Sequence, residues 1–137
     1  MHSLSDYDIS TDPSRLDREL IHRFLAEESY WARGRAREVT ERSIDGSLPF
    51  GIYLGAEQVG FARVVTDGTT FAWLADVFVV RPHRRRGLGK RLVQTVLEYP
   101  ELRSVYRWVL GTADAHELYR RYGFRETPAG RFMVREP

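Results

Sequence analysis

A glycine-spaced basic turn is the segment whose residue types and spacing most clearly predict chemistry. It runs from Arg84 to Arg91, contains Gly87 and Gly89, and follows an apolar run that ends at Val80. Apolar residues recur at helical spacing from Leu88 onward, so the turn opens a helix. A helix N-terminus offers unpaired N–H groups and a partial positive charge, and glycines let a ligand approach the backbone closely. We therefore expect the turn to bind the phosphates of a cofactor.

A mixed α/β arrangement around one sheet is expected to position this turn. Upstream, the sequence predicts a helix that begins at Asp12-Pro13, a helix over Gly34 to Ser43, and strands over Pro49 to Leu54, Val59 to Thr66 and Thr70 to Val80. Downstream, it predicts a helix from Leu88 that stops before Pro100, a strand over Val105 to Leu110, a helix over Ala113 to Tyr122 capped by Gly123, and a final strand or strand pair over Phe124 to Val134. The turn then joins the third strand to its helix.

Size and composition limit the class of protein. The chain has 137 residues, of which 42% are hydrophobic and 29% charged, which suits a single domain over residues 1–137. It contains no cysteine, which excludes disulfides, thiolate metal sites and cysteine nucleophiles. No His, Asp and Glu residues have ligand spacing, so no metal is expected. The sequence starts without a signal-peptide pattern, and no apolar run approaches the roughly 18–20 residues of a membrane span. We expect a cytoplasmic protein with no membrane partner.

The basic residues are concentrated rather than spread over the chain. The net charge is only +2, from 21 Lys plus Arg against 19 Asp plus Glu, and six basic residues fall between Arg81 and Arg91. This distribution favours a local anion site over a basic face, so nucleic acid is not the expected partner. A nucleic-acid-binding module that uses this stretch is the alternative from a different class, and its affinity would fall steeply with salt.

Two common phosphate-binding motifs do not fit the turn. A Walker-type loop requires glycine where Arg84 stands and a hydroxyl residue where Arg91 stands. A dinucleotide fingerprint requires a third glycine where Leu92 stands. The nucleoside-triphosphate and dinucleotide interpretations are therefore excluded.

A third pattern fits the turn. Arg84-x-x-Gly87-x-Gly89 after an apolar strand resembles motif A of the GNAT superfamily of N-acetyltransferases. The resemblance implies a small GNAT domain of the bacterial type, with a mixed, mostly antiparallel sheet flanked by helices and strands that splay at the cofactor cleft. It also implies that backbone N–H groups of the turn bind the pyrophosphate of acetyl-CoA, and that the pantetheine arm lies along the preceding strand. The implied cofactor-binding residues are Phe78, Val80, Arg84, Arg85, Arg86, Gly87, Leu88, Gly89, Lys90 and Arg91.

A second motif lies about thirty residues downstream. Ala115-x-x-Leu118-Tyr119-x-x-x-Gly123-Phe124 is similar to motif B of the same superfamily. Attack of an amine on a thioester expels a thiolate, and a tyrosine within hydrogen-bond reach of the sulfur can protonate it as a general acid. The resemblance therefore assigns this catalytic role to Tyr119.

An acidic residue on the strand before motif A often serves the family as the base. Asp76 matches that position, because it is the lone acid in an apolar run. A buried charge needs a partner, so an ion pair with Arg63 on the neighbouring strand is an equal alternative. The resemblance also places the segment from Glu27 to Arg33 over the acceptor site. Its acids and aromatic residues would suit a cationic amine, although packing of Tyr30 and Trp31 on the sheet is an alternative.

The two motifs together predict an N-acetyltransferase. It would transfer an acetyl group from acetyl-CoA to a primary amine of an unidentified small-molecule or peptide acceptor, by direct attack in a ternary complex. A non-catalytic acyl-CoA-binding regulator with the same fold is the alternative. Dimers are common among relatives, so the resemblance is compatible with a homodimer.

Overall fold

The structure, a computed structural model, describes residues 2–137. Its strands are β1 (Tyr7–Ser10), β2 (Leu48–Leu54), β3 (Glu57–Thr66), β4 (Phe71–Val79) and β5 (Arg107–Val109). Its helices are α1 (Arg18–Arg23), which continues as a π-helical turn over Phe24–Glu28, α2 (Arg37–Asp45), α3 (Leu88–Glu98) and α4 (His116–Arg120). No helix of residues 2–137 is long and apolar enough to cross a membrane.

The five strands form one mixed sheet in the order β1-β2-β3-β4-β5. Neighbouring strands from β1 to β4 are antiparallel, whereas β5 runs parallel to β4. The pairing of β4 with β5 covers only Phe71↔Arg107 to Trp73↔Val109, and the two strands then separate. The mostly antiparallel sheet and the splayed strands that the family resemblance implied are both confirmed.

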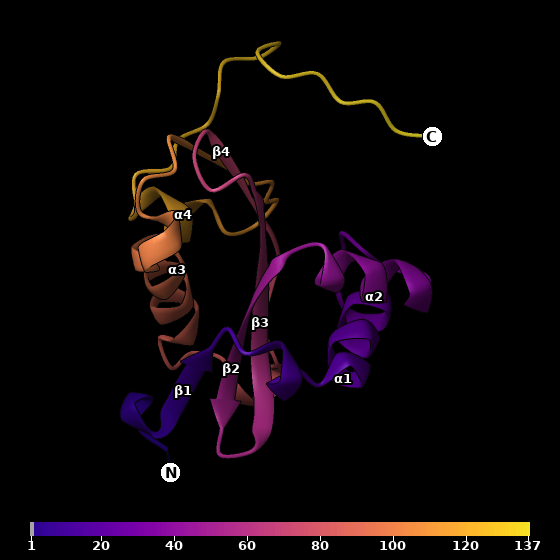
Figure 1. Cartoon of the computed structure of the whole chain (residues 1–137), viewed down its shortest axis with the longest axis vertical. Coiled ribbons are helices and arrows are strands. Elements are labelled where there is room, and N and C mark those ends of the chain that lie inside the picture. Colours follow the sequence, from indigo (N-terminus) through magenta and orange to yellow (C-terminus); the bar gives the residue numbers. More distant parts are fainter. Residues whose placement is uncertain (1) are drawn as a thin grey trace.

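Helices cover both faces of the sheet (Figure 1). On one face, the apolar stripe of α3 packs on the sheet core; its buried members are Leu88, Leu92, Val93 and Val96. On the other face, α1 and α2 enclose a second apolar cluster in which the rings of Phe24 and Phe78 stack with centroids 4.0 Å apart. The residues of β4 therefore contribute to both cores, and α3 begins directly beyond the end of β4.

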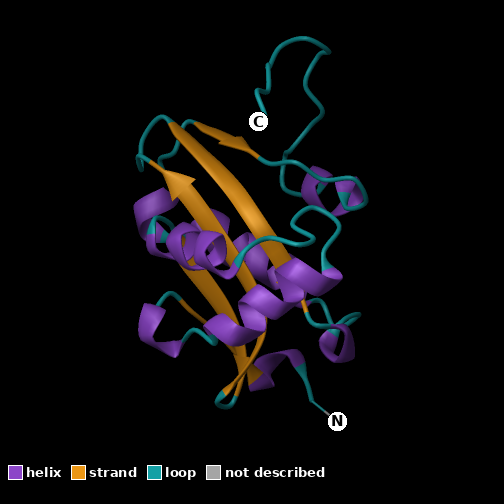
Figure 2. Ribbon diagram, turned by 90° about the vertical axis from the view of Figure 1, so that its right-hand side faces the viewer, coloured by secondary structure: helices purple, strands orange, loops and turns teal. Residues whose placement is uncertain are grey.

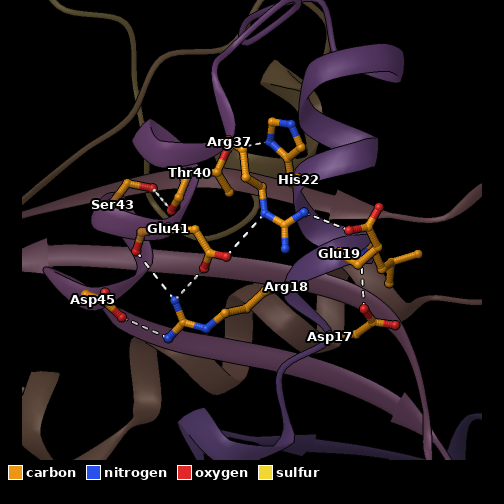
Figure 3. Close-up of polar contacts among 10 residues, drawn as sticks. Asp17, Arg18, Glu19, His22, Arg37, Thr40, Glu41, Ser43 and Asp45 are labelled. Carbon is orange, nitrogen blue, oxygen red and sulfur yellow. Dashed lines mark hydrogen bonds and ion pairs between the residues drawn. The ribbon is translucent and has the colours of Figure 1, made fainter.

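An ion-pair network fixes α1 against α2 (Figure 3). Arg18 donates to Glu41 and to Asp45, both at 2.9 Å. Arg37 donates to Glu19 at 2.7 Å and to Glu41 at 3.2 Å. Because the two helices are held together, the ends of the connecting segment, residues 29–36, are held as well.

Most predicted elements are present, with boundaries shifted by a few residues. The strand predicted over Phe124 to Val134 is wrong: this segment has no strand and runs away from the sheet as a tail (Figures 1 and 2). Met133 is 95% exposed, and Phe132 and Val134 are exposed as well, whereas Phe124 is half-buried against the sheet core. A strand needs a partner, and the edge of β5 is only three residues long. The sequence also did not predict β1, whose four residues pair with β2.

Candidate active site

A cavity of about 480 Å³ lies where β4 and β5 separate. Its walls come from the segment between α1 and α2, from β3 and β4, and from the segment between β5 and α4. The lining residues are Tyr30, Trp31, Arg35, Arg63, Trp73, Leu74, Ala75, Asp76, Val77, Leu110, Gly111, Thr112, Ala113, Asp114, Ala115 and Tyr119. This volume accommodates a small organic molecule. The cavity lies at the splay, and the two expected catalytic residues, Asp76 and Tyr119, both line it.

Tyr119 lies on α4 with its ring largely buried and on the cavity wall. Its ring packs edge-on against Phe124, with centroids 5.8 Å apart. Burial raises the pKa of Tyr119 to about 12, and the nearby Tyr30 and Asp114 act in the same direction. The phenol is therefore protonated at neutral pH, which is the state that a general acid requires.

Asp76 is held by three hydrogen-bond donors. Its Oδ2 accepts from Arg35 at 2.8 Å and from Arg63 at 2.7 Å, and its Oδ1 accepts from the Trp31 indole at 2.9 Å. Burial alone raises the pKa of Asp76, but the hydrogen bonds from Arg35 and Arg63 outweigh it, so the pKa lies below its usual value. The ion pair with Arg63 is thus present in the structure, and a carboxylate held in this way is a weak base.

A β-bulge places Asp76 in this position. The register between β3 and β4 shifts between Phe61↔Phe78 and Arg63↔Ala75. Asp76 has a φ of 53°, a left-handed conformation that Asp tolerates better than most residues. The irregularity turns the side chain toward Arg35 and Trp31, which belong to the segment between α1 and α2. Bulges commonly re-aim a side chain in this way.

The segment between α1 and α2 forms one side of the cavity, and its place over the acceptor site stays a prediction. The Ala113 N–H donates to the Tyr30 hydroxyl at 2.8 Å, which joins this segment to the one that precedes α4. Ser29 anchors it, because its hydroxyl donates to the Leu25 carbonyl at 2.7 Å. The aromatic residues line the cavity, whereas Glu27 and Glu28 are exposed and do not.

The glycine turn has a backbone that few other sequences could adopt. Gly87, the residue before α3, has a φ of 82°, and Arg85 has a φ of 64°. Nothing lies within 4 Å of the position of a Cβ on Gly87, so the backbone there is open to a ligand. No side chain caps the helix. The free N–H groups of the first turn of α3 fit a phosphate group.

The basic side chains of the turn have different surroundings. Arg84 donates to the Val79 carbonyl at 2.8 Å. Arg91 donates to the carbonyls of Leu4 and Tyr7, both at 2.8 Å, and so fastens the N-terminal segment to α3. Arg85, Arg86, Gly87 and Lys90 are exposed, whereas Leu88 is buried in the core. Because they are exposed, these four residues are available to phosphates. The buried Leu88 can contribute only its backbone.

The sheet register indicates which backbone groups of β4 face β3 and which face the open side. The Val80 N–H donates to the Val59 carbonyl at 2.9 Å, so it faces β3. Antiparallel partners alternate between bonded and non-bonded pairs, and Phe78, paired with Phe61, therefore faces β3 as well. The backbone groups that face the open side are those of Val77 and Val79. The contacts expected between the pantetheine arm and Phe78 and Val80 stay a prediction.

Arg35 is a charged cavity residue that the sequence did not predict. It lies outside both motifs and outside any hydrophobic periodicity, and only the fold brings it to Asp76 from a distant segment. The lone charge of Asp76 in an apolar run predicted a cationic partner. Arg63 alone was sufficient for that prediction, so nothing in the sequence indicated a second arginine.

Comparisons with known proteins agree with this geometry. The model of the acetyltransferase (GNAT) family matches residues 18–124. A solved structure of a candidate GNAT acetyltransferase from Xanthomonas campestris pv. campestris is 44% identical, with a TM-score of 0.90 over 96% of this chain and 93% of that one. A candidate acetyltransferase of Gibberella zeae is 30% identical over 83% of this chain and 76% of that protein. One from Deinococcus radiodurans R1, 22% identical with a TM-score of 0.76 over 98% of this chain and 92% of that one, shares the fold. The chain is an acyltransferase of the GNAT acetyltransferase family.

Proposed function

We propose that the protein transfers an acetyl group from acetyl-CoA to a primary amine, by direct attack while both substrates are bound. The observation that carries this proposal is the cavity at the splayed strands, which contains a buried, protonated tyrosine. Tyr119 lines the cavity, so its hydroxyl would be available to a thiolate that departs there.

The residues present fit the donor. Acetyl-CoA supplies an activated thioester, and its phosphates suit the exposed N–H groups of Gly87 to Lys90 together with the cations of Arg85, Arg86 and Lys90. The backbone groups of Val77 and the N–H of Val79 can pair with the amides of an extended arm, as they would with a neighbouring strand, whereas the Val79 carbonyl already accepts from Arg84. A ligand bound in this way would run from the turn toward Tyr119.

In the proposed reaction, Tyr119 donates one proton and then regains one. The amine nitrogen bonds to the acetyl carbon, the C–S bond breaks, and the departing sulfur takes the hydroxyl proton of Tyr119. The phenolate then recovers a proton that leaves the newly acylated nitrogen, through water where the two atoms do not touch. Asp76 contributes as a positioning residue, because its three donors and lowered pKa favour orientation of Arg35 and Trp31 over proton abstraction.

Replacement of Tyr119 by phenylalanine tests the proposal. We expect kcat for amine-dependent thiol release from acetyl-CoA to fall by about 100-fold or more, as is typical for loss of a general acid. The rise of the melting temperature with acetyl-CoA should persist, since binding stabilises by mass action. Tyr106→Phe is the matched control, because Tyr106 is 81% exposed and lies off the cavity. Unchanged turnover in Tyr119→Phe would remove the acid role, and acetyl-CoA binding without turnover in the wild type would favour a regulator.

A further inference from the structure

The buried part of the cavity wall holds more positive than negative charge. Four charged side chains line the cavity, namely Arg35, Arg63, Asp76 and Asp114. The first two share one oxygen of Asp76, and the three side chains are only 19%, 14% and 2% exposed. Asp114 is solvent-exposed and belongs to the segment between β5 and α4. One positive charge at the Arg35–Arg63 pair is therefore without a partner on its own wall.

The two guanidinium groups also retain unused hydrogen-bond donors. Arg35 uses only Nη1, and its Nε and Nη2 have no partner within residues 2–137. Arg63 uses Nε for Asp76 and Nη1 for the Ser47 hydroxyl at 3.1 Å, which leaves Nη2 without a partner in the same range. A guanidinium presents its N–H groups in a planar fork that matches the oxygens of a carboxylate or phosphate.

Partly buried charge is costly unless it is paired and hydrogen-bonded. Asp76 compensates one of the two arginines, and its oxygens already accept three bonds. The remaining charge and donors call for an anionic group from the cavity side. The surrounding wall is aromatic, with Tyr30, Trp31 and Trp73, and so suits an apolar body between two polar ends.

We propose that the acceptor is an amine that also carries an anionic group, a carboxylate or a phosphate, and that Arg35 and Arg63 bind this group. This inference rests on the proposed function and narrows its acceptor. The anionic end of the acceptor occupies the wall beside β3, and its amine points toward Tyr119. There the exposed carboxylate of Asp114 attracts the ammonium form of the acceptor before it is deprotonated. The Glu27 and Glu28 carboxylates, which would have favoured a purely cationic acceptor, lie off the cavity.

Matched pairs of amines test the inference. The pairs are phenylalanine with phenethylamine, β-alanine with ethylamine, and phosphoethanolamine with ethanolamine, so that each differs by one anionic group and the arms separate carboxylate from phosphate. We expect at least one anionic member to exceed its partner in kcat/KM by about tenfold or more, the effect of one charge-assisted contact. The same member should raise the melting temperature of the CoA-loaded protein further than its partner does.

Arg35→Gln should raise KM for that anionic amine by about tenfold with a smaller change in kcat, and Arg35→Lys should recover part of the loss. Arg33→Gln is the matched control, because Arg33 is exposed in the same segment and does not line the cavity. The inference is overturned if no anionic amine exceeds its partner in kcat/KM, or if none raises the melting temperature further than its partner does. It is also overturned if Arg33→Gln raises KM as much as Arg35→Gln does. A melting temperature that does not respond to CoA itself would instead refute the proposed donor site.

Discussion

Replacement of Asp76 by asparagine removes one buried negative charge and little else. Asparagine has the same size and tolerates the left-handed φ of 53° at this position. The variant leaves Arg35 and Arg63 facing each other across a carboxamide, at side-chain exposures of 19% and 14%. Breaking a buried ion pair costs about 3–5 kcal/mol, and the partial exposure of both arginines favours the lower end, about 3 kcal/mol. We expect the melting temperature to fall by roughly 10 °C.

Urea unfolding of the wild type and of Asp76→Asn measures this loss of the free energy of unfolding. Asp45→Asn is the matched control, because Asp45 also pairs with an arginine, at 2.9 Å, but its side chain is 67% exposed. An exposed pair contributes at most about 1 kcal/mol, so the control should lose far less stability. Equal losses in the two variants would refute the argument that burial gives the Asp76 pairs their strength.

The pH dependence gives a second check on the same residue. The pKa of Asp76 is lower in the folded chain than in the unfolded one. Its contribution is therefore fully present above the unfolded pKa of about 3.9 and is lost as the pH falls through the folded value. The stability gap between wild type and Asp76→Asn should be constant above about pH 5 and should narrow below pH 4. A gap that widens toward acid pH would contradict the assigned direction.

Three further substitutions test the local geometry. Arg85→Gly should be more stable than Arg85→Ala by about 1 kcal/mol, because only glycine relieves the φ of 64°; urea unfolding in which alanine equals glycine would contradict this. Gly60→Ala should cost about 1–3 kcal/mol in the same assay, since a Cβ there would lie 2.6 Å from Ile52 Cδ1 and 3.1 Å from the Phe78 carbonyl; a neutral change would show that this packing yields. Tyr53→Phe should retain or raise the melting temperature, because the buried Tyr53 hydroxyl has no hydrogen-bond partner within residues 2–137, and a loss above about 1 kcal/mol would reveal a partner.

The sequence predicted local features of this protein better than features set by distant contacts. The spacing from Leu88 onward, with Gly87 before it and Gly89 in its first turn, predicted α3 and its entrance, because helix periodicity and turn conformation are local properties. The bulge at Asp76 depends on how β3 pairs with β4, so the sequence could not show which backbone groups of β4 face the cleft.

Strand pairing explains both the unpredicted strand β1 near the N-terminus and the wrongly predicted strand near the C-terminus. The residues of β1 are few and half polar, yet Arg91 and the edge of β2 hold them in place. The segment from Phe124 to Val134 contains strand-forming residues such as Phe132 and Val134, but also Pro128 and Gly130, and it has no strand partner within residues 2–137. Strand formation is decided by pairing, which is a property of the whole fold. Arg35 escaped prediction for a similar reason, since its role depends on a contact 41 residues away.

The early end of the β4–β5 pairing has a consequence for the dynamics of the backbone. Amide groups on the open side of β4, at Val77 and Val79, lack the neighbouring strand that slows their exchange with solvent in the rest of the sheet. A ligand with amides at peptide-like spacing would complete the ladder there. Hydrogen exchange at these two positions should then slow when the donor binds, while the amides of Phe78 and Val80, already bonded to β3, change little. Hydrogen exchange at the Val77 and Val79 amides would therefore measure occupancy of the donor site in the absence of turnover.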